Sequence, residues 1–259
     1  MTGAALLECR GLTMRFGGVL ALDGLDLKVS AGEVLGLIGP NGSGKTTFFN
    51  VVSGIYRPNA GTINLDGIDV THAGPGLISA RGLARTFQRS RLNLSLSVFD
   101  NVVLGAYRHL NSGLWHNLIR RRAFRNEAQR VASEARELLA VFNTDLAERL
   151  FDSAGSLGMI DRRRVEICRA LIGRPKLVLL DEPSAGMTID ETDAVMDEIL
   201  GVRKSFGDLT VIIVEHEMGL IERVTNRCVV LNHGKKIFEG PYLDVAEDPV
   251  VREAYLGHA

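Results

Sequence analysis

Hydrophobic residues are distributed along this chain of 259 residues in patterns that differ from one region to the next. Four short runs are apolar on both faces and end in turn-forming or acidic residues: EVLGLIG (33–39), KLVLLDE (176–182), TVIIVEH (210–216) and RCVVLNHGK (227–235). Such runs are typical of parallel strands covered by helices. Two other runs, LECRGLTMRF (7–16) and GTINLDGIDV (61–70), alternate more regularly and predict a peripheral antiparallel layer.

The stretch from about 88 to 175 has the period of helices instead of strands. Within RNEAQRVASEARELLAVF (125–142), the apolar residues fall on one helical face; they are Ala128, Val131, Ala135, Leu138, Leu139 and Phe142. The pattern predicts an α/β core that is interrupted by a helical insertion.

Composition narrows the class of protein. A hydrophobic content of 46% supports a sizeable core, and 30 basic against 31 acidic side chains argue against a nucleic-acid partner. The cysteines at 9, 168 and 228 lie far apart, which fits a reducing compartment and excludes a cysteine zinc site. We see no secretion signal and no apolar run of about 20 residues that could span a bilayer. We therefore expect a cytoplasmic protein that docks on a membrane protein.

The segment GPNGSGKTT (39–47) matches the phosphate-loop pattern G-x-x-x-x-G-K-[ST] between a predicted strand and a predicted helix. Its glycines let backbone amides approach phosphates, and the helix N-terminus adds a positive dipole. Lys45 would neutralise the β- and γ-phosphates of ATP, and the Thr46 hydroxyl would ligate Mg²⁺. The candidate nucleotide-binding residues of this loop are Gly39, Asn41, Gly42, Ser43, Gly44, Lys45, Thr46 and Thr47.

A second motif supports the same chemistry. KLVLLDEP (176–183) is an apolar run that ends in Asp181 and Glu182. A carboxylate at the end of a buried strand can hold Mg²⁺ through water, and the next one can orient and deprotonate the attacking water. The two motifs together predict hydrolysis of ATP.

With these motifs the chain resembles the nucleotide-binding subunits of ABC transporters over nearly all of its length. TFQ, ending at Gln88, is similar to the Q-loop, and PSAGM (183–187) is similar to the D-loop. VEHEM places His216 at the position of the switch histidine, and Phe16 is at that of the aromatic that stacks on adenine. The resemblance implies that Gln88 contacts Mg²⁺ or water, and that His216 bonds the γ-phosphate and the attacking water.

The implied fold is an α/β P-loop NTPase, RecA-like, with a mainly parallel sheet, a peripheral antiparallel β layer and an inserted helical subdomain. We expect one ABC ATPase domain over 1–259. Residues 1–87 and 176–240 would form the core with its β layer, 88–175 the helical subdomain, and 241–259 a C-terminal helical tail.

Seven further segments resemble the ATPases of branched-chain amino acid importers: MRFGG, RTFQ, SVFDNV, RRRVEICRAL, EHEMGL, VVLNHGKKI and VVREAYLG. The implied partners are transmembrane permease subunits, a second ATP-binding subunit (identical or different) and an extracytoplasmic substrate-binding protein, at the inner face of the cell membrane. An export ATPase for a lipid-like substrate is the alternative. The long insertion HLNSGLWHNLIRRRAFRNEAQR (109–130) favours the importer.

The segment GSLGMIDRRRVEICRAL (155–171) departs from the family pattern, which has an LSGGQ-like signature there. Without gaps, its five places hold Leu157, Gly158, Met159, Ile160 and Asp161; a second register aligns SLG (156–158) with the serine-glycine region. Either register keeps Gly158 as a candidate nucleotide contact. A non-hydrolysing binding subunit is therefore a further alternative, but the complete set of motif residues, Glu182 above all, favours hydrolysis.

Overall fold

The computed structural model describes residues 5–88, 91–109, 121–207 and 209–256. The chain divides into two compact units. The sheet unit comprises Met1–Arg85, Lys176–Pro183 and Arg203–Ala259, and the helical unit comprises Thr86–Pro175 and Ser184–Val202.

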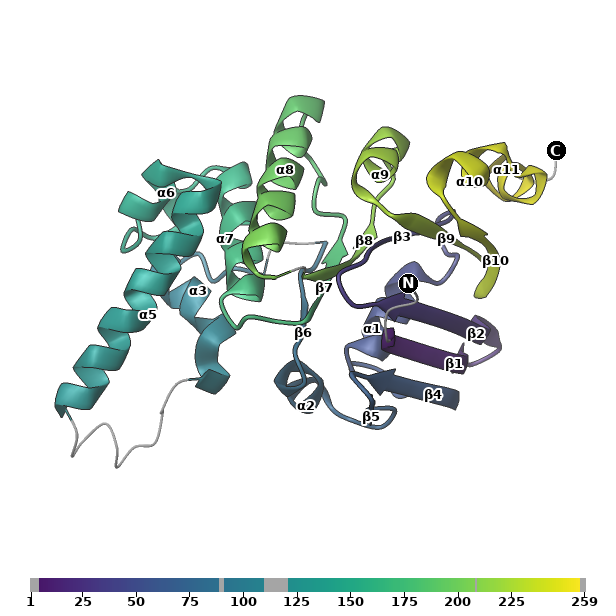
Figure 1. Ribbon diagram of the computed structural model, residues 1–259, viewed down its shortest axis with the longest axis horizontal. Helices are drawn as coiled ribbons and strands as arrows, with labels where there is room; N and C mark the ends of the chain where they lie inside the picture. Colours follow the sequence, from purple (N-terminus) through teal and green to yellow (C-terminus); the bar gives the residue numbers. More distant parts are fainter. Residues whose placement is uncertain (1–4, 89–90, 110–120, 208, 257–259) are drawn as a thin grey trace. The chain divides into compact units, whose positions relative to one another are not determined.

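A six-stranded sheet forms the centre of the sheet unit (Figure 1). In spatial order its strands are β10 (Lys235–Gly240), β9 (Arg227–Asn232), β3 (Val34–Ile38), β8 (Thr210–Val214), β7 (Leu177–Asp181) and β6 (Leu83–Arg85). All neighbours are parallel except β10, which pairs antiparallel with β9. Every residue of β3, β7 and β8 is buried, as expected for runs that are apolar on both faces.

The second sheet of this unit is antiparallel, with the order β2 (Val19–Ser30), β1 (Ala5–Phe16), β4 (Ala60–Leu65) and β5 (Ile68–Asp69). Burial alternates along β1 and β2, so one face of the layer enters the core. The core cluster combines residues of both sheets with Phe48 and Phe49, which are fully buried on α1 (Lys45–Val52). Helix α1 thereby anchors the loop that precedes it.

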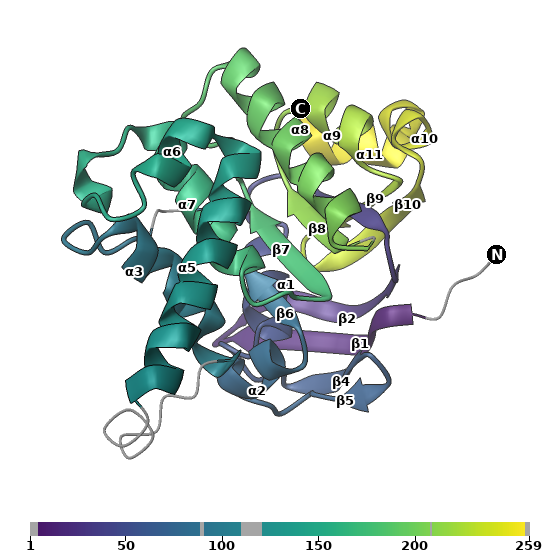
Figure 2. The same cartoon turned by 60° about the vertical axis from the view of Figure 1, so that its left-hand side comes forward.

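The remaining helices of the sheet unit are α2 (Pro75–Ala80), α9 (Met218–Val224), α10 (Tyr242–Glu247) and α11 (Pro249–Leu256). Helices α10 and α11 contact each other and strand β10 (Figure 2). The last described residues of the chain therefore cover the β10 edge of the large sheet.

In the helical unit, α5 (Arg121–Phe142) packs against α6 (Thr144–Glu148) and α7 (Met159–Leu171) (Figure 2). The other described elements are α3 (Val98–Val103), η1 (Leu104–His109), η2 (Ala154–Ser156) and α8 (Ile189–Ser205). Helix α8 belongs to this unit as far as Val202. Five of the six residues predicted for the apolar face of α5 are buried: Val131, Ala135, Leu138, Leu139 and Phe142. Part of the predicted insertion, 110–120, lies outside the described residues.

The structure confirms the predicted α/β fold with a mainly parallel sheet, an antiparallel layer and a helical insertion. Residues 184–202, which the sequence interpretation assigned to the core, belong to the helical unit. Arg164 of α7 donates to Glu198 of α8 at 2.6 and 3.0 Å, which links α8 to the rest of this unit.

Among the described residues, we find no helix with the length and apolar composition that a membrane span requires.

Candidate active site

The phosphate loop connects β3 to α1 and depends on glycine at two points. Gly39 and Gly44 have φ of 147° and 111°, which side chains rarely allow. A Cβ on Gly39 would lie 2.1 Å from the Leu231 carbonyl oxygen, and one on Gly44 would lie 2.5 Å from that of Ala21. The loop therefore runs against its neighbours at distances that only glycine permits.

Lys45 is the first residue of α1 and is buried within the loop. Its Nζ donates to the carbonyl oxygens of Gly39 at 2.6 Å and Pro40 at 3.0 Å. Burial lowers the pKa of Lys45, and the carboxylates of Glu182 and Asp181 act against that shift. The ammonium is thus surrounded by the loop and lies within the field of the two predicted carboxylates.

The other predicted loop residues differ in exposure. Asn41, Gly42 and Thr46 are exposed, Thr47 is half-buried, and Ser43 is 2% exposed. The Oγ atom of Ser43 has no hydrogen-bond partner within the described part of the chain. Because no side chain caps α1 and its first turn holds no acidic residue, the loop offers backbone amides and hydroxyls to an anion.

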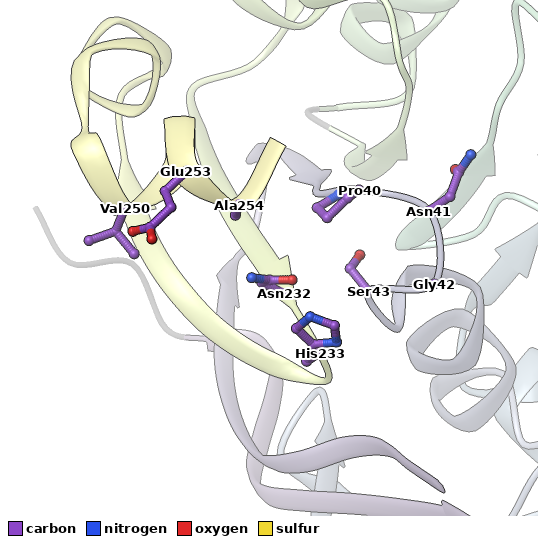
Figure 3. A pocket seen from close by; sticks show the side chains of 9 residues that line it. All are labelled: Pro40, Asn41, Gly42, Ser43, Asn232, His233, Val250, Glu253 and Ala254. Atoms are coloured by element: carbon purple, nitrogen blue, oxygen red, sulfur yellow. The ribbon is translucent and has the colours of Figure 1, made fainter. Parts of the chain in front are cut away.

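The turn between β9 and β10 supports the loop from the side of β9. The Gly234 amide donates to the Ser43 carbonyl at 2.9 Å, and the Gly234 carbonyl accepts from the Asp23 amide at 3.0 Å. Beside this turn, a pocket of about 380 Å³ is lined by the loop, the turn and α11 (Figure 3). Partial burial raises the pKa of Tyr255 of α11 to about 12, and the Gly39 backbone acts against that shift. The C-terminal helix is therefore in contact with the start of the loop.

Glu182 and His216 meet at the ends of adjacent parallel strands. The Oε1 atom of Glu182 lies 3.0 Å from Nε2 of His216, and Asp181 pairs with Val214 in the register of β7 and β8. Glu182 has a φ of 47°, in the left-handed region that non-glycine residues seldom occupy. Such backbone strain is concentrated at functional sites, because there the surroundings enforce one side-chain direction. The pair can act as a base and a hydrogen-bond donor on one water molecule.

Asp181, at the end of β7, is buried and forms an ion pair with Arg85 of β6 at 2.8 Å. Sequence reasoning missed Arg85. Its position at the end of a short strand directly before Thr86-Phe87-Gln88 was the available signal.

Phe16 ends β1 and is 42% exposed, which leaves a ring face available for stacking. Its ring meets that of Tyr56 edge-on, with centroids 5.3 Å apart and an interplanar angle of 75°. Tyr56 is a second residue that the motifs did not indicate. Thus the sheet unit contains Phe16, the phosphate loop, Asp181, Glu182 and His216.

Gln88 and Gly158 belong to the helical unit. Gln88 is exposed, and its backbone carbonyl accepts a hydrogen bond from Arg163 at 3.3 Å. Gly158 is the N-cap of α7, with φ −65° and ψ 168°, and no side chain caps this helix. Met159, the first residue of α7, is 53% exposed. In the register without gaps, the helix thus begins with an apolar side chain at a place where the family pattern has glycine.

Ser156 precedes the helix and is engaged in a local turn. Its hydroxyl donates to the Ser153 carbonyl at 2.8 Å and accepts from Arg149 at 3.0 Å. This observation bears on the two possible registers of the signature, because the serine of the second register is already bonded within η2 and its neighbours.

Comparison with known proteins gives consistent matches over the whole chain. The family model described as ABC transporter matches residues 22–185, and the one described as branched-chain amino acid ATP-binding cassette transporter matches 235–259. The high-affinity branched-chain amino acid transport ATP-binding protein BraF of Pseudomonas aeruginosa is 39% identical, with 98% of each chain covered. The LivG protein of Escherichia coli, which carries the same description, is 36% identical, also with 98% of each covered.

Solved structures agree with these sequence matches. A nucleotide-free ATP-binding cassette from an ABC transporter superposes with a TM-score of 0.83 at 27% identity, covering 98% of this chain and all of that one. Another ATP-binding cassette, in its ADP conformation, gives a TM-score of 0.83 at 26% identity with the same coverage. The predicted resemblance is confirmed. The chain belongs to the ATP-binding proteins of the ABC transporter family, which are ATPases.

Proposed function

We propose that this chain is the ATP-binding and ATP-hydrolysing subunit of an ABC importer for branched-chain amino acids or similar small amino acids. Relatives that match 98% of the chain are described as branched-chain amino acid transport proteins, and the C-terminal match at 235–259 belongs to the same group. One structural observation carries the enzymatic part of the proposal. It is the 3.0 Å contact between Glu182 and His216 in the unit that also contains the phosphate loop.

The nucleotide would bind along the phosphate loop of the sheet unit. Lys45 would release the carbonyls of Gly39 and Pro40 and bond the β- and γ-phosphates, while the amides of residues 41–47 surround them. Phe16 would stack on the adenine through its exposed face. The buried, unbonded Ser43 hydroxyl fits an additional polar contact within this loop.

The oxygen donors that these residues offer fit Mg²⁺. Thr46 supplies an exposed hydroxyl in the first turn of α1, and Asp181 supplies a carboxylate that Arg85 holds from the neighbouring strand. We propose that Gln88 completes this set. When bound, the ion neutralises charge on the β- and γ-phosphate oxygens.

Hydrolysis would rest on Glu182 and His216. Glu182 accepts a proton from the attacking water, and its strained backbone keeps the carboxylate directed at the imidazole. His216 holds the water and donates to the γ-phosphate. Gly158 and the free amides at the start of α7 would contact the nucleotide of a second ATP-binding subunit.

The proposed assembly follows from the family. The chain would form one ABC ATPase domain from the sheet and helical units, with 241–259 as a C-terminal tail. It would pair with a second ATP-binding subunit, identical or different, and dock on transmembrane permease subunits at the inner face of the cell membrane. A substrate-binding protein would deliver the amino acid outside the cell.

The direct test is the variant Glu182→Gln. We expect it to bind Mg·ATP at least as tightly as the wild-type chain and to lose hydrolysis by about 10²–10⁴-fold, the usual contribution of a general base. A wild-type chain that binds Mg·ATP and hydrolyses it no faster than Glu182→Gln would instead be a non-hydrolysing nucleotide-binding subunit. The apolar Met159 and Ile160 in the signature segment are the observation that favours this second candidate.

A further inference from the structure

Three consecutive arginines lie in the first half of α7, and each makes contacts with a different part of the helical unit. Arg162 donates to the Gly155 carbonyl at 2.8 Å, within the turn that precedes the helix. Arg164 pairs with Glu198 of α8. Arg163 is directed to the Gln88 segment, whose described residues are 86–88 and 91. Helix α7, which we call the signature helix because it begins in the signature segment, is therefore linked to three neighbouring segments by adjacent residues.

Arg163 and Glu166 form a buried pair, with 6% and 2% of their surfaces exposed. The Nη1 atom of Arg163 donates to Glu166 at 3.0 Å and also to the Phe87 carbonyl at 3.0 Å. Its Nη2 atom donates to the Gln88 carbonyl at 3.3 Å. The other carboxylate oxygen of Glu166 accepts from the Arg91 amide at 2.6 Å. Two side chains of one helix thus bind the backbone of this segment at Phe87, Gln88 and Arg91.

Arg169, further along α7, extends the same contact. It donates to the Arg91 carbonyl at 2.9 Å. The Arg91 guanidinium in turn lies 4.1 Å from the centroid of the Phe87 ring, within the range of a cation–π contact. Phe87 and Arg91 therefore contact each other as well as the helix.

These hydrogen bonds reach the main chain of Phe87, Gln88 and Arg91, while Gln88 itself is exposed. The buried Arg163 guanidinium donates to two backbone carbonyls and one carboxylate. Because its donors have fixed directions, these bonds restrict the backbone conformation of the Gln88 segment. Moving the segment away from α7 would leave a buried charged pair with unsatisfied groups.

We propose that Arg163 and Glu166 are positioning residues that fasten the Gln88 segment to the signature helix, so that both move as one body during the ATPase cycle. The inference rests on the proposed function, in which Gln88 and Gly158 contact nucleotide. It assigns a role to RRRVEICRAL, a motif whose arginines and glutamate the phosphate chemistry does not use.

Glu166→Gln and Arg163→Lys in the purified full chain test the proposal. Glu166→Gln keeps the shape of the side chain but loses the charge, and Arg163→Lys keeps the charge but loses the forked donors. We expect ATP affinity within about twofold of wild type, because the phosphate loop belongs to the sheet unit. The value of kcat should fall about tenfold, the effect of one lost charge-assisted hydrogen bond.

Hydrogen exchange at the Arg91 amide supplies a readout that does not depend on activity. Glu166→Gln should accelerate this exchange, because the amide loses its charged acceptor. Glu134→Gln is the matched control, since Glu134 pairs with Arg130 at 2.7 Å on the exposed side of α5. It should leave both kcat and exchange at Arg91 unchanged.

Folded Glu166→Gln and Arg163→Lys variants with wild-type kcat and unchanged exchange at Arg91 would overturn the proposal. If Glu166→Gln does not fold, the kcat of Arg163→Lys tests the proposal instead. If the wild-type chain itself does not hydrolyse ATP, the proposed function fails, and exchange at Arg91 still decides whether the segment is fastened to α7.

Discussion

Arg85 and Asp181 form an ion pair of 2.8 Å between the ends of β6 and β7, with 5% and 6% of their side chains exposed. Arg85 also donates to Asn50 of α1 at 2.7 Å, and its guanidinium lies 5.4 Å from the centroid of the Phe49 ring. One buried cation therefore connects the proposed Mg²⁺ carboxylate to the helix that begins with Lys45. Arg85 therefore orients the Asp181 carboxylate.

Arg85→Met should destabilise the nucleotide-free chain by about 3 kcal/mol, because it leaves Asp181 charged and buried without its cation. Urea denaturation would measure the loss. Arg130→Met is the control: its pair with Glu134 has 53% and 33% of the side chains exposed, and its loss should cost less than about 1 kcal/mol. Equal effects of the two substitutions would contradict the prediction.

Gly158→Ser should strengthen the start of α7. A Cβ at Gly158 meets nothing within 4 Å, and the backbone has the extended conformation that suits a serine N-cap. The gain in stability should be about a few tenths of a kcal/mol. If Gly158 occupies the serine place of the signature, the ATPase rate of the assembled transporter should rise about tenfold, through one restored hydrogen bond to phosphate.

Gly201→Ser is the control that separates an effect on helix stability from an effect on the ATPase rate. Gly201 lies within α8, and a Cβ there also meets nothing within 4 Å, so serine should stabilise that helix by roughly 0.5 kcal/mol through propensity alone. Its ATPase rate should stay at the wild-type level. A rate increase in both variants would mean that stability, and not the signature hydroxyl, limits turnover.

Alkaline pH should affect stability and nucleotide binding in opposite directions through Lys45. Burial lowers its pKa below the ordinary 10.5, which the unfolded chain retains. Between the lowered pKa of the folded chain and the ordinary pKa, the unfolded chain binds more protons than the folded chain. The contribution of Lys45 to stability therefore rises with pH in this range. ATP affinity should fall over the same range, because a neutral amine no longer balances phosphate charge. Stability and ATP affinity should be measured against pH for the wild-type chain and for Lys45→Met. If the two proteins show the same pH dependence, the prediction is contradicted.

The three cysteines should be unreactive in the folded chain. All are buried, and burial raises the pKa of Cys9 to about 12 and that of Cys168 well above its ordinary value. Ellman's reagent at about pH 8 should therefore detect no thiol in the native chain and three in urea. Rapid reaction of any thiol under native conditions would show that its surroundings open.

The raised pKa of Cys9 also predicts how the stability of the chain changes at alkaline pH. The Cys9 thiol of the unfolded chain ionises at its ordinary pKa of 9.0, whereas the folded thiol stays neutral until about 12. The contribution of the Cys9 thiol to the free energy of unfolding is therefore complete below the pKa of the unfolded chain. It is lost as the pH rises toward the pKa of the folded chain. Cys9→Ala should lose less stability than wild type across this interval in urea titrations.

Much of the fold could be predicted because its signals are local. The four apolar runs became β3, β7, β8 and β9, since residues buried on both faces need cover from both sides. The apolar stripe of 125–142 became the buried face of α5. Strands β2, β6 and β10 were not predicted: no run was assigned to 19–30, β6 has only three residues, and β10 has no buried ones.

For this protein, the amino-acid sequence alone determined the type of sheet, the loop between β3 and α1 and the identity of the family, because spacing along the chain specifies local backbone and chemistry. Tertiary structure decided which distant groups meet. The contacts of Glu182 with His216, Arg85 with Asp181 and Arg163 with Phe87 join residues 34, 96 and 76 positions apart. Such contacts depend on strand order and helix packing, which no short stretch of sequence encodes.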